Sequence, residues 1–255
     1  MYYIILRKVF PMNKLKELSV FFPAYNEEGN IKDTVSKALS FLPDISETFE
    51  VIIVNDGSID GTPRVAGELA AEFPQVRLVN HDHNRGYGAA VRTGFSESRY
   101  GYIFFTDGDG QFDIRELRDF LPLISECDIV AGYRIRRNDP FYRLINAKAY
   151  NLLVRLLFGL KVRDIDCAFK IIRKKVVDSL ELKSESQFVS AEFLVKARKK
   201  GFTIKQKGAH HFPRKEGAPT GNSISAIVNS FRELFALRGE LSRKENNENS
   251  QGLRK

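Results

Sequence analysis

Residues 102–111 read YIFFTDGDGQ, a short apolar run followed directly by two aspartates in a glycine-containing turn. The run Tyr102–Thr106 has the aromatic and apolar composition of a buried strand. Ligands of open parallel sheets bind outside the carboxyl ends of the strands, which is where Asp107 and Asp109 would lie. Two carboxylates at this spacing can face one hard cation, which prefers oxygen ligands. The same turn could also serve only to cap the helix that follows.

Similar apolar runs occur on both sides of this segment and alternate with amphipathic stretches. The expected strands are Leu18–Phe22, Glu50–Val54, Val76–Val79, Tyr102–Thr106 and Asp128–Gly132. The expected helices between them are Glu28–Phe41, Thr62–Phe73, Gly88–Ser98 and Ile114–Ser125. This alternation predicts right-handed βαβ units and an α/β fold with a mostly parallel sheet. The second half is less regular, with helices expected at Phe141–Phe158 and Ala191–Lys200 and strands at Ala168–Ile172 and Phe202–Lys207.

The composition indicates a globular chain with an anionic partner. The 255 residues are 43% hydrophobic and 28% charged, and the net charge is +8. Residues 132–175 hold twelve Lys or Arg against three Asp or Glu, so this one segment carries +9 and predicts phosphate binding. A solvated charged face would show the same composition.

Nothing in the sequence predicts secretion or a membrane span. Cys127 and Cys167 form neither a disulfide framework nor a metal-spaced cluster, which favours a reducing compartment. No apolar run approaches the ~20 residues that a membrane span needs, and Tyr2–Leu6 is too short for a signal-peptide core. We therefore expect a cytoplasmic protein that is free or peripheral on a membrane.

Two more acidic motifs follow expected strands. They are PAYNEE at residues 23–28 and VNDGSIDGT at residues 54–62. Asp56 could accept hydrogen bonds from a base or a ribose, although an ordinary strand–turn–helix connection would use the same residue types. Residues 84–88, NRGYG, match part of a dinucleotide fingerprint, but Val91 replaces the third glycine. A helix N-terminus with close backbone approach is the better interpretation of that segment.

Taken in order, these motifs resemble the family 2 glycosyltransferases of the GT-A fold. The resemblance is to the branch of dolichyl-phosphate mannosyltransferase and the polyprenyl-phosphate sugar transferases, and it covers about Leu18 to Leu237. The matching pieces are Pro23–Glu28, Asn55–Thr62, Asn84–Ala90, Asp107–Gln111, Asp164–Lys170 and His211–Arg214. It implies a Rossmann-like, mostly parallel sheet flanked by helices, with an irregular second half on the acceptor side.

The resemblance also implies residues for the nucleotide-sugar donor and for a metal ion. The donor would be bound by Pro23, Ala24, Tyr25, Glu27, Val54, Asp56, Asp107, Gly108, Asp109 and Arg134. Mg²⁺ or Mn²⁺ would be held by Asp107, Asp109 and Gln111. Gly108 replaces the usual alanine, a change of little consequence because the family uses the backbone there.

On the acceptor side the resemblance implies Arg143, Asp164, Lys170, Arg214 and Ser223. Asp107, Asp109, Arg143 and Arg214 would form the catalytic set. Two segments depart from the family. Its Ser-Gly pair is Cys167-Ala168 here, and its short Arg-x-x-Gly-x-Ser motif is stretched from Arg214 to Ser223. Both departures concern the acceptor side.

The implied reaction is inverting, metal-dependent transfer of a hexose from GDP-mannose or UDP-glucose to a polyprenyl phosphate, dolichyl or undecaprenyl. A phosphate monoester has a second pKa of about 6, so it is largely dianionic at neutral pH. It can therefore attack the sugar carbon without a general base. Transferases to hydroxyls usually carry a Glu-Asp pair, but Phe193 follows Glu192 here. Transfer to a saccharide or lipid hydroxyl with Glu192 as base, and an inactive nucleotide-sugar-binding subunit, are the alternatives. A nucleic-acid partner is not expected, because the basic segment lacks a reading motif.

The expected organisation is an N-terminal arm at residues 1–16, a catalytic domain at 17–221, an amphipathic helix at 222–239 and a disordered tail at 240–255. The helix would carry one apolar stripe, formed by Ile224, Ile227, Val228, Phe231, Leu234 and Phe235. Such a stripe can pack on the protein's own core. If it is uncovered, it predicts contact with an anionic membrane surface on the cytoplasmic face, or with a membrane-embedded partner protein.

Overall fold

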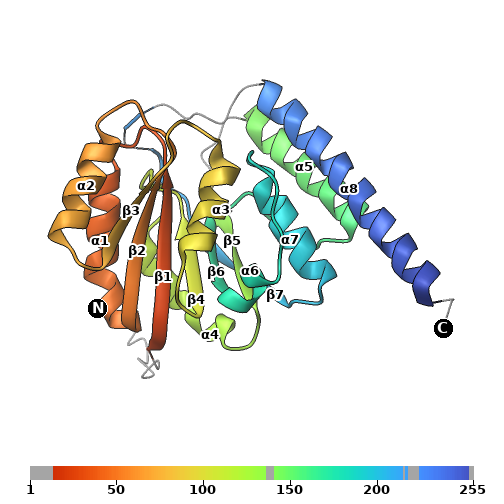
Figure 1. Cartoon of the computed structure of the whole chain (residues 1–255), viewed down its shortest axis with the longest axis horizontal. Coiled ribbons are helices and arrows are strands. Elements are labelled where there is room, and N and C mark those ends of the chain that lie inside the picture. The colour runs from red at the N-terminus through yellow and green to blue at the C-terminus, as the bar shows by residue number, and fades with distance from the viewer. Residues whose placement is uncertain (1–13, 136–140, 215, 218–223, 253–255) are drawn as a thin grey trace, which may run out of the picture.

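Seven strands form one sheet in the described part of the chain, in the order β3-β2-β1-β4-β6-β5-β7. The computed structural model describes residues 14–135, 141–214, 216–217 and 224–252, without the side chains of 141–147, 224–228 and 244–252 (Figure 1). The strands are β1 Leu15–Ala24, β2 Ser46–Asn55, β3 Val76–Asn80, β4 Tyr102–Thr106, β5 Ile129–Ile135, β6 Phe169–Arg173 and β7 Ile204–His210. The predicted α/β class is confirmed, and each predicted strand overlaps an observed one.

One strand departs from the parallel arrangement. The neighbouring pairs β1–β2, β2–β3, β1–β4 and β5–β7 are parallel, whereas β6 is antiparallel to both β4 and β5. Phe169 at the start of β6 therefore pairs with Thr106 at the end of β4. As a result, the segment that enters β6 reaches the same sheet edge as the Asp107–Asp109 turn.

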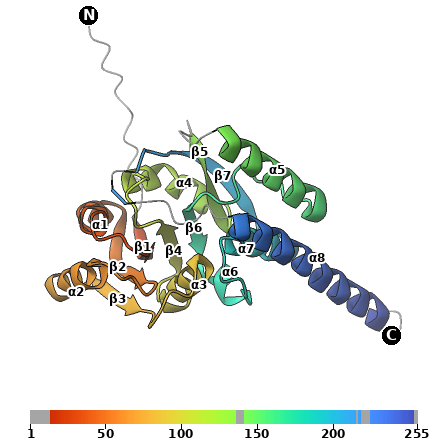
Figure 2. The same ribbon diagram turned by 90° about the horizontal axis from the view of Figure 1, so that it is seen from above.

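Helices cover both faces of the sheet. They are α1 Ile31–Ile45, α2 Thr62–Glu72, α3 Tyr87–Glu97, α4 Leu121–Ile124, α5 Phe141–Phe158, α6 Lys174–Asp178, α7 Val189–Lys199 and α8 Ile224–Gly252, with a 3₁₀ helix at Ile114–Asp119. In Figure 2, α1 and α4 lie on one side of the strands and α3 and α6 on the other. Among the described helices, none is long and apolar enough to cross a membrane.

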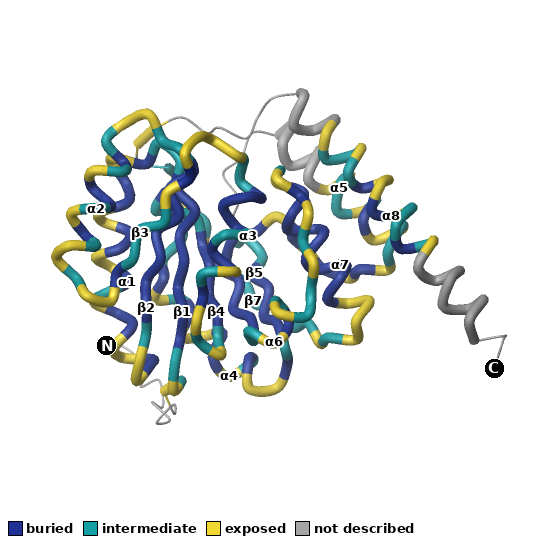
Figure 3. The backbone as a smooth tube through the Cα atoms, viewed as in Figure 1, coloured by how far each residue is buried: buried dark blue, intermediate teal, exposed yellow. Residues whose placement is uncertain are grey.

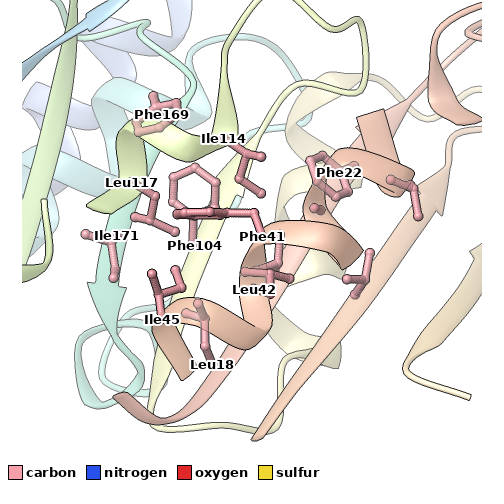
Figure 4. Packing of buried hydrophobic residues seen from close by; sticks show 14 of the residues in the cluster. Leu18, Phe22, Phe41, Leu42, Ile45, Phe104, Ile114, Leu117, Phe169 and Ile171 are labelled. Atoms are coloured by element: carbon pink, nitrogen blue, oxygen red, sulfur yellow. The ribbon is translucent and has the colours of Figure 1, made fainter. Parts of the chain in front are cut away.

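The two faces of the sheet form two apolar cores. Alternating residues of β1 divide between them, since Val20 and Phe22 pack with α1 and α2 while Phe21 packs with α3 and α7. Figure 4 shows Phe22 and Phe104 of the sheet against Phe41 of α1. The central strands are buried over most of their length (Figure 3). This rigid centre fixes the loops that follow β1, β2 and β4.

The helix predicted at Ile114–Ser125 is wrong as a continuous element. The structure has a 3₁₀ helix at Ile114–Asp119 and a single α-turn at Leu121–Ile124. Pro122 lies in the first turn of that second piece. Proline has no backbone N–H and its ring clashes with the preceding turn, so Pro122 favours a break between the two pieces.

The C-terminal helix extends further than the sequence predicts. A disordered tail is expected from Glu240, but α8 continues to Gly252. Leu241 is buried and lies on the same helix face as Leu234 and Leu237, so the core contact of α8 extends past Glu240. The expected N-terminal arm falls almost entirely on residues 1–13, which are outside the described part of the chain.

Candidate active site

A cavity of about 770 Å³ opens at the carboxyl ends of β1, β2 and β4. Of the site residues that the sequence predicts, it is lined by Pro23, Ala24, Tyr25, Glu27, Asp56, Asp107, Gly108, Asp109, Gln111, Arg134 and Arg214. The structure thus brings together the predicted acidic strand ends. Arg143 lies on α5 among the residues whose side chains are not described, and Ser223 is outside the described chain.

Asp107 lines this cavity and has one oxygen without a hydrogen-bond partner. Its Oδ1 atom is buried and has no hydrogen-bond partner. The carboxylate accepts a hydrogen bond from the Tyr87 hydroxyl at the start of α3. Burial, and then the negative charge of Asp109, raise the pKa of Asp107 to about 7. A buried carboxylate without a compensating cation is unfavourable, so this site favours the approach of positive charge.

Asp109 is engaged by the turn itself and by Arg214. Its Oδ1 accepts from the backbone N–H of Gln111 at 3.0 Å, and its Oδ2 lies 3.5 Å from Arg214 Nη1. Burial raises the pKa of this carboxyl as well. The backbone bond fixes the turn that presents both aspartates.

Arg214 bridges two segments that are distant in sequence. Its Nη2 donates to Glu27 Oε1 at 2.5 Å and its Nε donates to the Glu216 carbonyl at 2.7 Å. The other oxygen of Glu27 accepts from Asn30 Nδ2 at 2.8 Å, and burial raises the pKa of Glu27. Glu27, implied by the resemblance as a nucleobase contact, therefore lies beside Asp109 and is held by Arg214.

The aspartate turn fits a divalent cation that is shared with a ligand. In the described residues no group of three or more His, Cys, Asp or Glu side chains is arranged to hold a metal ion. Asp107 and Asp109 provide carboxylate oxygens, one of them unpaired, and Gln111 lines the same cavity with its Nε2 donating to the Phe212 carbonyl. These oxygen donors suit Mg²⁺ or Mn²⁺, with phosphate oxygens or water completing the coordination.

Asp56, which the resemblance implies as a donor contact, is held by several hydrogen bonds at the edge of the cavity. Its Oδ1 lies 2.6 Å from His81 Nδ1, and its two oxygens accept from the backbone N–H groups of Arg85 and Gly86, each at 2.9 Å. Gly86 has a φ of +97°, and a Cβ there would lie 2.3 Å from the Glu185 carbonyl oxygen. The interpretation of this segment as a helix start with close backbone approach is confirmed.

Arg134 reaches the cavity from the end of β5 with Asp164 behind it. Its Nε and Nη2 donate to the two Asp164 oxygens, each at 2.7 Å. Burial would lower the pKa of Arg134, but the hydrogen bonds and charge of Asp164 outweigh it and raise that pKa. The sequence predicts Asp164 as an acceptor contact, but Asp164 does not line the cavity. Its hydrogen bonds instead orient Arg134.

Two other predicted contacts are enclosed by the protein. Val54 is fully buried in the core of β2 and does not line the cavity. Lys170 is also fully buried, its ammonium donating to the Cys167 carbonyl and lying 5.3 Å from the centre of the Phe105 ring. Burial lowers the pKa of Lys170. Lys170 is predicted to contact the acceptor, but it does not line the cavity. Its positive charge instead acts on Asp107 and opposes the rise of that carboxyl's pKa.

The described basic side chains at residues 132–175 are spread over the structure and do not gather around the cavity. Arg173 lies at the opposite end of β6, paired with Tyr102, and donates to the Cys127 carbonyl at 3.0 Å. Lys175 pairs with Asp128 at 2.7 Å. Of the described side chains of this segment with positive charge, Arg134 alone lines the cavity. Arg134 is therefore placed where it could contact a phosphate in the cavity, and phosphate binding by the segment stays a prediction.

Glu192 is not available as a general base. Its carboxylate is buried and accepts from the backbone N–H groups of Lys183 and Ser184 at about 3 Å. Lys196 Nζ lies 2.6 Å from its Oε1. The alternative in which Glu192 activates a hydroxyl is wrong, because this carboxylate fixes the loop before α7.

The part of the cavity beside α7 and α8 carries residues that the sequence did not predict as site residues. They include Asp166 before β6, Glu185, Ser186, Gln187 and Ser190 around the start of α7, and Asn229 and Glu233 on α8. These residue types are common in loops and on helices, and no spacing marks them. His81, which holds Asp56, was missed for the same reason. Packing of α8 across the sheet edge brings Glu233 to the site, and only the tertiary structure reveals this.

The site has the features of one class of enzyme. An α/β sheet with an Asp-x-Asp turn at a central strand end, facing a cavity shared with acidic β1 and β2 ends, is typical of glycosyltransferases of the GT-A type. The family model for glycosyl transferase family 2 matches residues 19–180. The chain belongs to this family.

Curated relatives and solved structures agree with this assignment. Glycosyltransferase AglD of Haloferax volcanii is 34% identical over 200 residues, 74% of this chain and 32% of that protein. The human dolichyl-phosphate beta-glucosyltransferase is 32% identical over 180 residues, 63% of this chain and 56% of that protein. The chain spans between about a third and two thirds of the length of the relatives it matches. Glucosyl-3-phosphoglycerate synthase of Mycobacterium tuberculosis superposes with a TM-score of 0.69 at 18% identity over 88% of this chain and 80% of that one, a likeness of fold.

Proposed function

We propose that this chain transfers glucose from UDP-glucose to a polyprenyl phosphate, with inversion at the sugar carbon. The observation that carries the proposal is the Asp107–Asp109 turn, with its unpaired buried oxygen, facing the cavity at the end of β4. The name of the human relative, a dolichyl-phosphate beta-glucosyltransferase, supports both the sugar and the acceptor.

The donor side of the mechanism follows from the described contacts. Asp107, Asp109 and Gln111 would hold Mg²⁺ or Mn²⁺, which neutralises negative charge on the departing nucleoside diphosphate. Asp56, fixed by His81 and by two backbone N–H groups, would orient the nucleoside. Arg214 lies against Asp109 and Glu27, so it can contact the diphosphate beside the aspartate turn.

The acceptor side favours a phosphate over a hydroxyl. A phosphate monoester is largely dianionic at neutral pH and attacks the sugar carbon directly, whereas a hydroxyl requires a base. Glu192 cannot supply that base, because its carboxylate is bonded to the Lys183–Ser184 backbone and to Lys196. Arg134 faces the cavity and would bind a phosphate oxygen.

A polyprenyl chain resides in a bilayer, so the site must work at a membrane surface. Leu156 on α5 is 72% exposed and Phe235 on α8 is 58% exposed, and exposed arginines lie beside them at Arg155 and Arg232. Apolar side chains interleaved with basic ones are typical of helices that lie on anionic membranes. We therefore propose peripheral attachment through α5 and α8, on the cytoplasmic face where nucleotide sugars are made.

The apolar stripe expected on the C-terminal helix needs correction in this context. Leu234 is fully buried and Phe231 packs near Tyr150, with ring centres 6.3 Å apart. Part of the stripe thus belongs to the core, because α8 packs against α5 and the rest of the second core cluster (Figure 1). Phe235 remains as an outward apolar residue of that stripe.

The proposal is tested with the full chain, Mn²⁺, dolichyl phosphate in detergent, and radiolabelled UDP-glucose or GDP-mannose. We expect a glucose-labelled lipid, and a loss of at least about 100-fold in Asp109→Ala, since an interaction of this kind supplies several kcal/mol. Glu47→Ala is the control, because the Glu47 side chain is exposed and remote from the cavity. A mannose-labelled lipid would overturn the donor assignment, and donor hydrolysis without any lipid product would overturn the acceptor.

A further inference from the structure

The part of the cavity beside α7 and α8 has a distinct chemical character. Five polar side chains, which we call the α8 subsite, line it together: Asp166, Glu185, Ser186, Asn229 and Glu233. Three are carboxylates, and neither Arg134 nor Arg214 belongs to this group. They come from the loop before β6, the loop before α7, and α8, and the loop before α7 also contacts Gly88, whose N–H donates to the Glu185 carbonyl at 2.9 Å.

Glu233 is held in place by one of its two oxygens. Its Oε2 accepts from Ser186 Oγ at 2.5 Å and from Ser184 Oγ at 3.1 Å. The loop that carries both serines is itself fixed, because the buried Glu192 carboxylate accepts the Ser184 backbone N–H at 2.9 Å. None of the described hydrogen bonds of Glu233 engages its Oε1. A rigid carboxylate with one uncommitted oxygen on a cavity is suited to accept a hydrogen bond from a ligand.

A second group close to this subsite also lacks a partner. The Tyr150 hydroxyl of α5 is buried and makes no hydrogen bond within the described structure. Burial, followed by the negative charges of Asp166 and Glu233, raises the pKa of Tyr150, so the hydroxyl stays protonated beside them. A buried hydroxyl without a partner is unfavourable. The hydrogen bonding of this region is therefore incomplete among the residues that the structure describes.

The charge of the α8 subsite selects the kind of ligand. Carboxylate oxygens accept hydrogen bonds strongly and repel other anions. Sugar hydroxyls supply the matching donors, and Asn229 and Ser186 can serve as either donor or acceptor. A phosphate or a second carboxylate would instead face the like charges of Glu185 and Glu233 in a partly desolvated space, while Asp166 also lies near Arg134.

We infer that the α8 subsite binds the sugar of the donor, that Glu233 accepts a hydrogen bond from a sugar hydroxyl, and that the subsite selects neutral hexoses over uronic acids. This inference rests on the proposed function, since it assigns the sugar of that same reaction. Glu233 is a specificity-determining residue and Ser186 positions it. Rejection of a uronate follows from the introduced repulsion as much as from the lost hydrogen bond.

Calorimetry with UDP, UDP-glucose and UDP-glucuronate tests the inference on the full chain with Mn²⁺. In Glu233→Ala we expect UDP to bind as in the wild type and UDP-glucose to bind about tenfold more weakly, as for loss of a hydrogen bond to a charged group. In Glu233→Gln we expect preference for UDP-glucose over UDP-glucuronate to fall at least about tenfold. Glu240→Gln is the matched control, because Glu240 lies on the same helix, pairs with Lys183 and does not line the cavity.

Ser186→Ala provides a second variant that leaves α8 unchanged. It removes the shorter of the two hydrogen bonds to Glu233, so it should shift UDP-glucose affinity in the same direction and leave UDP affinity unchanged. Unchanged UDP binding in each variant also reports that the protein is folded.

The outcomes separate this inference from the proposed function. Normal lipid glucosylation, with an unaltered UDP-glucose to UDP affinity ratio in Glu233→Ala and Ser186→Ala, would overturn the sugar assignment alone. The expected affinity pattern without any transfer to polyprenyl phosphate would overturn the acceptor and support the sugar assignment. A wild type that binds UDP-glucuronate as tightly as UDP-glucose would overturn the predicted selectivity.

Discussion

Arg214 connects two acidic residues of the cavity, because it contacts both Glu27 and Asp109. All three of its described hydrogen bonds use the guanidinium: Nη1 to Asp109, Nη2 to Glu27 and Nε to the Glu216 carbonyl. A lysine has the same charge but lacks the planar fork that makes these contacts together. At this position, geometry rather than charge is expected to matter.

We expect Arg214→Lys to reduce lipid glucosylation by about 100-fold, with a melting temperature close to that of the wild type. The reduction follows because one ammonium cannot hold Glu27 and Asp109 while also meeting a diphosphate. Steady-state assays and thermal unfolding measure the two effects. Arg115→Lys is the control, since Arg115 pairs with Asp113 on the surface away from the cavity. Full activity of Arg214→Lys would refute the role of the fork.

Asp107 makes stability depend on pH in the metal-free protein. Its pKa is about 7 in the folded protein and has an ordinary value of 3.8 otherwise. Between these values the folded state keeps a proton that the unfolded chain has lost. Stability from this group is therefore present at low pH and is lost as the pH rises to about 7.

Asp107→Asn should consequently raise the melting temperature at pH 8 by about 4 °C or more, and change it little at pH 4. A gain of ~1 kcal/mol corresponds to about 2–4 °C in a chain of this size, and the shift predicts more than that. The measurement is thermal unfolding in excess chelator across this pH range. Asp44→Asn, an exposed partner of Arg118, is the control. An equal melting temperature for Asp107→Asn and wild type at pH 8 would contradict the raised pKa.

Individual site residues were predictable only where they follow a strand in a recognisable turn. Asp56, Asp107 and Asp109 satisfy this condition, because the carboxyl ends of parallel strands meet at one edge. His81 follows β3 directly but no recognisable turn marks it, and it acts through its hydrogen bond to Asp56, whereas helix packing brings Glu233 to the site. Lys170 shows the opposite error, because a motif match does not report burial.

At the scale of elements, periodicity predicted the strands and most helices but not their directions. The sequence of β6 reads like that of the parallel strands of the sheet, yet β6 runs antiparallel to its two neighbours, β4 and β5. Strand direction depends on how the preceding connection crosses the sheet, and no local pattern encodes that path. The 3₁₀ helix before Pro122 illustrates a local signal, proline within an apolar period, that does mark a break.

The burial of α8 predicts effects of different size at two adjacent positions. Leu234 is fully buried and Phe235 is 58% exposed. We expect Leu234→Ala to lower the free energy of unfolding by about 2–5 kcal/mol, because it leaves a cavity in the second core. Phe235→Ala should change it by less than about 1 kcal/mol. Urea denaturation measures both, and similar effects at the two positions would show that α8 does not pack as described.

Over the whole molecule, positive charge and exposed apolar side chains are found away from the acidic cavity. The described lining carries seven carboxylates, at Glu27, Asp56, Asp107, Asp109, Asp166, Glu185 and Glu233, against the guanidinium groups of Arg134 and Arg214. The net charge of +8 therefore resides elsewhere, including the exposed basic residues of α5 and α8. This separation of charge fits the proposal that the basic exterior contacts an anionic membrane surface and that the acidic cavity binds a metal-bound nucleotide.

Membrane attachment is expected to depend on both charge and apolar contact. The wild type should co-sediment with anionic liposomes at low salt and dissociate as ionic strength rises, since each basic residue contributes about 1 kcal/mol near such a surface. The double variant Leu156→Glu, Phe235→Glu should remain largely in the supernatant. The matched control is Ile59→Glu, which changes an exposed apolar residue in the loop before α2. Wild-type protein that stays in the supernatant at low salt would refute the attachment.

The bridge from Arg214 to Glu27 and Asp109 has a consequence for synthesis on the ribosome. A nascent chain that has emerged only as far as residue 200 contains Glu27 and Asp109 but has neither β7, which covers the edge of β5, nor Arg214. Until the last quarter of the chain is translated, the sheet keeps an open edge and its acidic pocket lacks this counter-charge. The protein therefore completes its sheet and its active centre in the same late step, and both reach their final form only after most of the polypeptide has been made.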